Sequence, residues 1–124
     1  AAARIDDAAN YLPARLTALL MALAAYIPFR KGKSARNLKE ELRFIRRYGR
    51  MHASPNSGYP EAALAGILDC RFGGPHHYFG EYCFKPYIGN RLRPLTTTDM
   101  QQAVTVNRRA EILMILTGVL LYLL

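Results

Sequence analysis

Residues 12–29 form an 18-residue apolar run that is interrupted only by Pro13, Arg15 and Thr17. A helix that crosses a bilayer needs about 20 apolar residues, so this run predicts a membrane helix of marginal length. Arg15 lies near one end, where its long side chain can reach the interface. It can also face a protein interior, where an ionisable residue is a candidate functional residue. The alternative for the run is a buried helix of a soluble protein.

Basic residues follow this run immediately. Residues 30–50 contain nine Lys or Arg residues and two glutamates, so they carry +7 of the net charge of +8. Basic residues beside a span mark its cytoplasmic side. Arg108 and Arg109 precede the uncharged run 112–124 in the same way. Both flanks therefore place the middle of the chain on the cytoplasmic side of a membrane.

Residues 36–48 are predicted to form a basic amphipathic helix. Leu38, Leu42 and Ile45 share one face of this helix, and Lys and Arg residues surround them. Such a helix suits anionic lipid headgroups, so membrane lipid is a predicted partner. Nucleic acid is not a predicted partner, because no nucleic-acid recognition motif accompanies the charge.

The predicted fold class is mainly α: an integral membrane helical protein with a cytoplasmic helix-and-loop region. The chain is expected to be a fragment of a longer one, organised as a single domain over residues 1–124. Its parts are a membrane helix at 12–29, a cytoplasmic region at 30–111 and the start of a second membrane helix at 112–124. The last run is too short to span a bilayer by itself.

Residues 52–61 form a polar segment that proline makes stiff. Two prolines, a glycine, an asparagine and two serines lie between His52 and Glu61. Pro60 suits the first position of a helix, and Glu61 then complements its exposed amides. A stiff polar loop that leads into a helix is a candidate site for phosphate or a metal-bound nucleotide. An ordinary proline-rich connection is the alternative.

The remaining segments give weaker signals. Residues 77–89 are rich in aromatic residues and glycine and are expected to be irregular or to form a short extended pair. Thr98 and Gln101 have the spacing of a capping box, which predicts a helix that begins at about Asp99.

Asp6, Asp7 and Asn10 have a spacing that brings their side chains to neighbouring positions on a helix. Mg²⁺ prefers hard oxygen ligands of this kind, so these residues are the candidate metal ligands. Asp and Asn are also common near the start of a helix as caps and as solvated residues, and this alternative stays open.

Several blocks of the sequence together resemble the CobD/CbiB family, the integral membrane adenosylcobinamide-phosphate synthases of cobalamin biosynthesis. The resemblance covers residues 4–17 and 52–94 and implies that the chain is the C-terminal portion of such a protein. The blocks are Asp6-Asp7-x-x-Asn10, Leu12-Pro-Ala-Arg-Leu-Thr17, Ser54-Pro-Asn-Ser-Gly-Tyr-Pro-Glu-Ala-Ala63, Gly73-Gly-Pro75, Tyr78-Phe-Gly80 and Lys85-Pro-Tyr-Ile-Gly89.

The resemblance implies an ATP- and Mg²⁺-dependent ligase that joins aminopropanol or its phosphate to adenosylcobyric acid through an amide bond. This chemistry needs a metal, cations for phosphate oxygens and a base for the ammonium group. His52 is the predicted base because of its intrinsic pKa. The candidate residues are Asp6, Asp7 and Asn10 for the metal; His52, Ser54, Asn56, Ser57 and Glu61 for catalysis; and Arg15, Gly58, Gly73, Gly74 and Lys85 for substrate or phosphate.

The expected location is a bacterial or archaeal cytoplasmic membrane, crossed several times, with a corrinoid substrate and other cobalamin-assembly enzymes as partners. The first alternative is a non-catalytic membrane sensor or scaffold whose basic helix binds lipid or a partner. A soluble nucleic-acid-binding protein is the second. A single span at 12–29 would separate Asp6 from Glu61 by a bilayer, so we expect residues 6–10 to lie within a helix bundle or a re-entrant segment.

Overall fold

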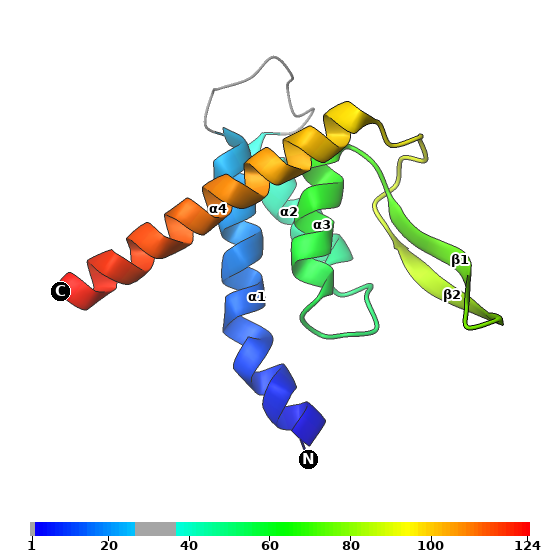
Figure 1. Cartoon of the computed structure of the whole chain (residues 1–124), viewed down its shortest axis with the longest axis horizontal. Helices are drawn as coiled ribbons and strands as arrows, with labels where there is room; N and C mark the ends of the chain where they lie inside the picture. Colours follow the sequence, from blue (N-terminus) through cyan, green and yellow to red (C-terminus); the bar gives the residue numbers. More distant parts are fainter. Residues whose placement is uncertain (1, 27–36) are drawn as a thin grey trace.

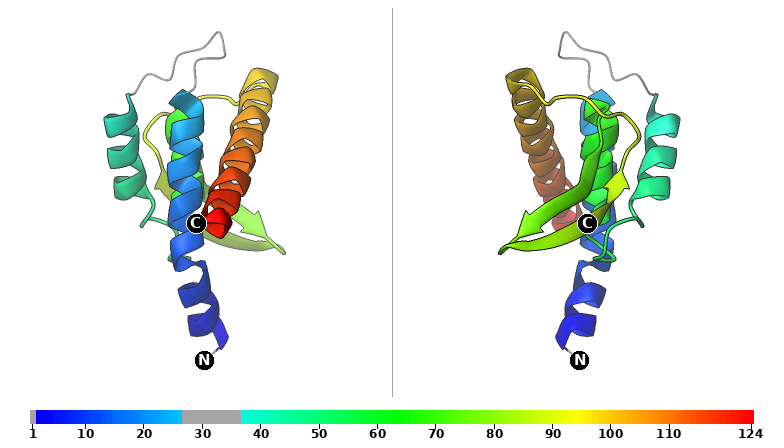
Figure 2. Two further views of the ribbon diagram at one scale, coloured as in Figure 1. Left: turned by 90° about the vertical axis from the view of Figure 1, so that its left-hand side faces the viewer. Right: turned by 90° about the vertical axis from the view of Figure 1, so that its right-hand side faces the viewer.

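The computed structural model describes residues 2–26 and 37–124, and these residues form four helices and one β-hairpin (Figure 1). Helices α1, α2 and α3 lie side by side, α4 crosses α1, and the hairpin extends from the bundle (Figure 2). The prediction of a mainly α fold is confirmed. The elements are α1 (Ala2–Tyr26), α2 (Leu38–Tyr48), α3 (Gly58–Leu68), β1 (Phe72–Tyr78), β2 (Glu81–Ile88) and α4 (Thr97–Leu123).

The core depends on small side chains that let the helices approach closely. On α1 the fully buried residues include Ala18, Ala22 and Ala24, and α3 contributes Ala62, Ala63 and Ala65. Larger side chains fill the space between these helices, because close-packed interiors leave few voids. The larger residues of this core are Leu20, Met21, Ile45, Ile67 and Val106.

Helix α1 begins ten residues before the apolar run and continues through Pro13. Over Ala2–Ala25 it is the one described helix that is long and apolar enough, by length and composition, to cross a membrane. Residues 27–29, which end the apolar run, lie outside the described part of the chain. The basic residues within 30–36, which were predicted to mark the cytoplasmic side, also lie outside it.

Helix α2 confirms the predicted amphipathic helix, but not its predicted face. It begins at Leu38, with Asn37 as its N-cap: the Asn37 side chain accepts a hydrogen bond of 2.9 Å from the Glu40 amide. The buried residues are Glu41, Phe44, Ile45 and Tyr48, whereas Leu42 is 39% exposed. Leu42, which was predicted to share one apolar face with Leu38 and Ile45, is therefore not part of the buried face, because the carboxylate of Glu41 occupies that face instead.

The start of α4 also differs from the prediction. Thr96 is the N-cap, and the capping box joins Thr96 to Asp99 instead of Thr98 to Gln101. The Asp99 carboxylate accepts from the Thr96 amide at 2.8 Å, and the Thr96 hydroxyl accepts from the Asp99 amide at 3.2 Å. Three consecutive threonines can each cap a helix, and the carboxylate three residues after Thr96 selects the first.

The predicted extended pair at 77–89 is present as part of a longer antiparallel hairpin. Phe72 pairs with Ile88 and Gly74 pairs with Lys85, so a bulge in β2 places Pro86 and Tyr87 opposite the single residue Gly73. Gly73 has φ +95°, and a Cβ there would collide with the Pro86 carbonyl. The position opposite the bulge therefore requires glycine, and the bulge sets the register that pairs Lys85 with Gly74.

Candidate functional site

The loop before α3 and the hairpin enclose a small pocket that contains four of the predicted site residues. Its volume is about 80 Å³. His52 and Glu61 come from the loop and the first turn of α3, whereas Gly73 and Lys85 come from the hairpin. We call this site the hairpin pocket; the other residues that line it are Ala53, Phe84, Pro86 and Ile88.

His52 and Glu61 form an ion-pair geometry at the edge of the hairpin pocket. The His52 Nε2 atom lies 3.6 Å from Glu61 Oε2, and the two side chains are 23% and 34% exposed. His52 Nδ1 accepts a 2.9 Å hydrogen bond from the Ser54 amide, which fixes the ring. In the neutral ring Nδ1 is thus the acceptor, so Nε2 carries the proton and points it towards Glu61. This geometry favours Glu61 as the proton acceptor of the pair.

A second group of contacts, the loop anchor, holds the same loop against α1. Asn56 is 6% exposed, and its Nδ2 donates to the Asp7 carbonyl at 2.9 Å. Its Oδ1 accepts from Arg15 at 3.2 Å. The Arg15 guanidinium also lies 3.5 Å from the Tyr11 ring centre and 4.2 Å from that of Tyr59. Arg15 and Asn56 therefore position the loop.

The candidate metal ligands lie on the part of α1 next to the loop anchor. Asp6 and Asn10 are exposed, and Asn10 Nδ2 donates to Asp6 Oδ1 at 3.1 Å. Asp7 is half-buried, and its carbonyl contacts Asn56. The loop therefore contacts this turn of α1 through the Asp7 backbone, while the Asp6 and Asn10 side chains stay exposed. The described residues contain no group of three or more His, Cys, Asp or Glu side chains able to hold a metal ion.

Ser54, Ser57 and the glycines have structural partners. Ser54 Oγ accepts from the Ser57 hydroxyl at 3.2 Å and from the amides of Asn56 and Ser57 at 3.4 Å, which rigidifies the turn into α3. A Cβ on Gly58 would lie 2.8 Å from His52 Cβ and would collide with the Gly49 carbonyl. Gly58 therefore lets the first turn of α3 pack closely against the Gly49 carbonyl and the His52 side chain. Gly74 is buried against the Tyr87 ring.

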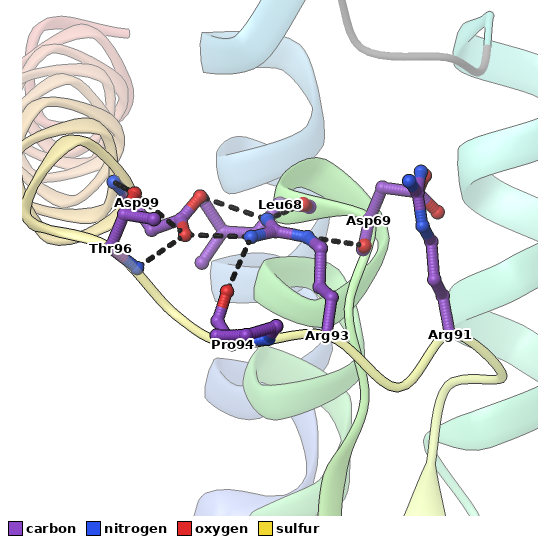
Figure 3. A network of polar contacts seen from close by, with 7 residues as sticks. All are labelled: Leu68, Asp69, Arg91, Arg93, Pro94, Thr96 and Asp99. Atoms are coloured by element: carbon purple, nitrogen blue, oxygen red, sulfur yellow. Dashed lines mark hydrogen bonds and ion pairs between the residues drawn. The ribbon is translucent and has the colours of Figure 1, made fainter.

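An arginine network that the sequence analysis missed connects the end of α3 to the start of α4 (Figure 3). Arg93 donates to both carboxylate oxygens of Asp99, at 2.7 and 2.8 Å. It also donates to the carbonyls of Leu68 and Asp69 at the C-terminus of α3. The Arg93 guanidinium holds the pKa of the Asp99 carboxyl far below its usual range. An arginine that caps a helix through tertiary contacts has no local sequence signal.

Glu41 is a second buried charged residue that the sequence analysis missed. It is 2% exposed, and its carboxylate lies against Gly66 of α3, where a Cβ would be 2.6 Å from Oε1. Gly66 therefore makes room for a carboxylate between α2 and α3. Cys70, which follows α3, is also buried, and burial raises the pKa of its thiol.

Comparison with known proteins identifies the family of this chain. The family model described as "CobD/Cbib protein" matches residues 1–107. The cobalamin biosynthesis protein CobD of Geobacter metallireducens is 47% identical over 116 residues, which are 94% of this chain and 35% of that protein. CobD of Desulfotalea psychrophila is 47% identical over 103 residues, and CobD of Klebsiella pneumoniae 45% over 102. The two matched segments cover 83% and 82% of this chain, and they cover 29% and 30% of the Desulfotalea and Klebsiella proteins, respectively.

The chain thus spans about a third of the length of the curated relatives that it matches. No solved structure matches it. The family model covers most of the chain, and the relatives are 45–47% identical to it. This chain therefore belongs to the CobD/CbiB family of cobalamin biosynthesis proteins.

Proposed function

We propose that this chain forms part of a membrane-bound, ATP-dependent ligase that joins aminopropanol or its phosphate to adenosylcobyric acid through an amide bond. The observation that carries the proposal is the hairpin pocket, which combines a carboxylate, an imidazole and an ammonium group from three separate segments. Amide formation from an amine requires a group that accepts a proton and cations that bind the anionic ends of the substrates. The pocket contains both.

The proposed roles follow from the geometry of these side chains. Glu61 binds the substrate ammonium group and accepts its proton, while the Nε2–H group of His52, 3.6 Å from Glu61 Oε2, keeps its proton and helps to orient the carboxylate. Lys85 is exposed on β2 at the pocket and binds a carboxylate or phosphate oxygen. A volume of about 80 Å³ holds the reacting end of a small amine substrate, not a corrin ring.

When bound, ATP would transfer its terminal phosphoryl group to the carboxylate, the amine would displace inorganic phosphate as the amide bond forms, and Mg²⁺ would neutralise phosphate charge. Mg²⁺ in such sites is bound by one or two carboxylates together with substrate phosphates. Asp6 and Asp7 provide two carboxylates on the α1 turns that contact the loop, so the chain fits this mode of binding. The loop anchor then holds the metal-binding turn in a fixed relation to the loop that carries His52.

The proposal is tested with the intact protein in detergent or nanodiscs, supplied with adenosylcobyric acid, ATP, Mg²⁺ and aminopropanol phosphate. We expect an amide product, identified by mass spectrometry, and ATP consumption that requires both other substrates. Asp7→Asn should raise the Mg²⁺ concentration needed for half-maximal activity. A folded protein that binds the corrinoid but forms no product would contradict the proposal and favour the non-catalytic sensor or scaffold.

A further inference from the structure

The β-hairpin presents an exposed apolar face beside the hairpin pocket. Tyr82 and Phe84 are two residues apart on β2, so their side chains lie on the same face of the strand. These side chains are 65% and 58% exposed. The register pairs Phe84 with the exposed Pro75 of β1, which adds a third apolar side chain to this face. We call these three residues the hairpin face; a contiguous exposed apolar patch of this kind marks a site of interaction.

Phe84 connects the hairpin face to the hairpin pocket. It lines the pocket together with His52 and Glu61, the pair proposed to bind the amine. Its ring also meets the Tyr87 ring edge-on, with the ring centres 5.9 Å apart, and this contact restricts the Phe84 ring. The hairpin face therefore begins at the edge of the pocket.

The size of the hairpin pocket determines which part of a large substrate must lie outside it. The pocket has a volume of about 80 Å³, whereas pockets that enclose a drug-sized ligand have roughly 300–1,000 Å³. A substrate with a large ring can place only the side chain that bears its reacting carboxylate in this pocket. Its ring must then lie against the surface at the edge of the pocket. Among the described residues that line the pocket, Phe84 has the one aromatic ring apart from His52.

We infer that the hairpin face binds the corrin ring of the corrinoid substrate, while the carboxylate side chain of that substrate enters the hairpin pocket. The inference rests on the proposed function and assigns a binding surface to one of its substrates. A corrin ring is large, rigid and apolar on its two faces, and aromatic side chains bind such surfaces with little loss of conformational entropy. Lys85 follows Phe84 on β2 and lines the pocket, so its ammonium group is next to the carboxylate that the ring carries.

The inference is tested by corrinoid binding to the intact protein in detergent or nanodiscs, without ATP or amine, so that no reaction takes place. Equilibrium dialysis with adenosylcobyric acid gives the Kd from the visible absorbance of the corrin. Tyr82→Ala and Phe84→Ala each remove one ring of the hairpin face, and Phe84→Tyr retains it. Phe79→Ala is the matched control, because Phe79 is 90% exposed in the turn between β1 and β2, outside the hairpin face.

We expect the Kd for the corrinoid to rise at least about fivefold in Tyr82→Ala and in Phe84→Ala, as for side chains at the centre of a binding surface. The Kd should stay near the wild-type value in Phe84→Tyr and in Phe79→Ala. An unchanged Kd in both alanine variants of the hairpin face would overturn the inference, as would an equal loss in Phe79→Ala or the absence of corrinoid binding to the wild-type protein.

Two further measurements identify a different occupant of the hairpin face. If another segment of the intact protein covers this face, Tyr82→Ala should lower the thermal unfolding midpoint and leave the corrinoid Kd unchanged. If the adenine ring of ATP lies there, the Kd of a non-hydrolysable ATP analogue should rise in place of the corrinoid Kd. Either result overturns the inference. Corrinoid binding through this face without amide formation would contradict the proposed function alone, whereas amide formation with an unchanged corrinoid Kd in the variants would contradict this inference alone.

Discussion

Replacing Arg93 by alanine should loosen the junction of α3 and α4 by about 3 kcal/mol. Arg93 makes two short hydrogen bonds to Asp99, and the two side chains are only 23% and 12% exposed. Removing one partner of a buried ion pair costs roughly 3–5 kcal/mol. The partial exposure of the pair and the hydrogen bonds from Thr96 to Asp99 put this junction at the low end of that range.

Arg91 provides a matched control two residues away. It also pairs with an aspartate, at 2.6 Å from Asp69, but its side chain is 62% exposed. An exposed pair contributes at most about 1 kcal/mol, so Arg91→Ala should have a small effect.

Hydrogen exchange of peptides covering residues 65–72 and 96–101 in the intact protein measures the local opening directly. Since about 1.4 kcal/mol corresponds to a factor of ten, exchange should rise on the order of 100-fold for Arg93→Ala and at most about fivefold for Arg91→Ala. Equal protection in both variants would refute the reasoning that burial makes the Arg93 pair strong.

Gly66→Ala should lower the thermal unfolding midpoint, because overpacking against the buried Glu41 carboxylate costs on the order of 1–3 kcal/mol. Gly118→Ala is the control: an added Cβ there has nothing within 4 Å, so the midpoint should not fall. Equal midpoints for the two variants would contradict this reasoning. The pKa of Asp99 is lowered by its hydrogen bond from Arg93, so its contribution to stability is complete above its ordinary value of 3.8 and is lost as the pH falls below it. The stability difference between wild type and Asp99→Asn, from unfolding at pH 7 and pH 3, should therefore shrink in acid; a constant difference would count against the ion pair. Burial raises the pKa of the Cys70 thiol, so in a Cys83→Ser background Cys70 should react with a maleimide far more slowly than the unfolded chain, and rapid labelling of the folded protein would show that the thiol is accessible.

Local patterns predicted the helices well because each helix has its own signal in the sequence. The amphipathic period of α2 and the proline near the start of α3 both predicted helices at about the observed positions, although α3 begins at Gly58, two residues before Pro60. The packed face of α2 was predicted less well. Periodicity places charged residues in solvent, and it cannot anticipate a buried Glu41 that Gly66 of another helix accommodates.

The candidate site was predictable only in part. His52 and Glu61 flank one stiff loop, and their proximity follows from local geometry. Lys85 reaches the same pocket because the β2 bulge opposite Gly73 sets the hairpin register, and the sequence alone did not predict that register. The Arg93 network escaped prediction because it joins the last carbonyls of α3 to a carboxylate of α4, and no local spacing describes such a contact.

The most direct test of the hairpin pocket compares Glu61→Gln with Glu81→Gln in the intact protein. Both variants remove one carboxylate charge, but Glu61 lines the pocket, whereas Glu81 is exposed at the start of β2. Proton transfer by a positioned group contributes typically about 10²–10⁴-fold to a rate. We therefore expect kcat/KM for aminopropanol phosphate to fall at least about 100-fold in Glu61→Gln and to stay near wild type in Glu81→Gln. Equal activity in the two folded variants would contradict the assignment of the hairpin pocket as the site of amide formation.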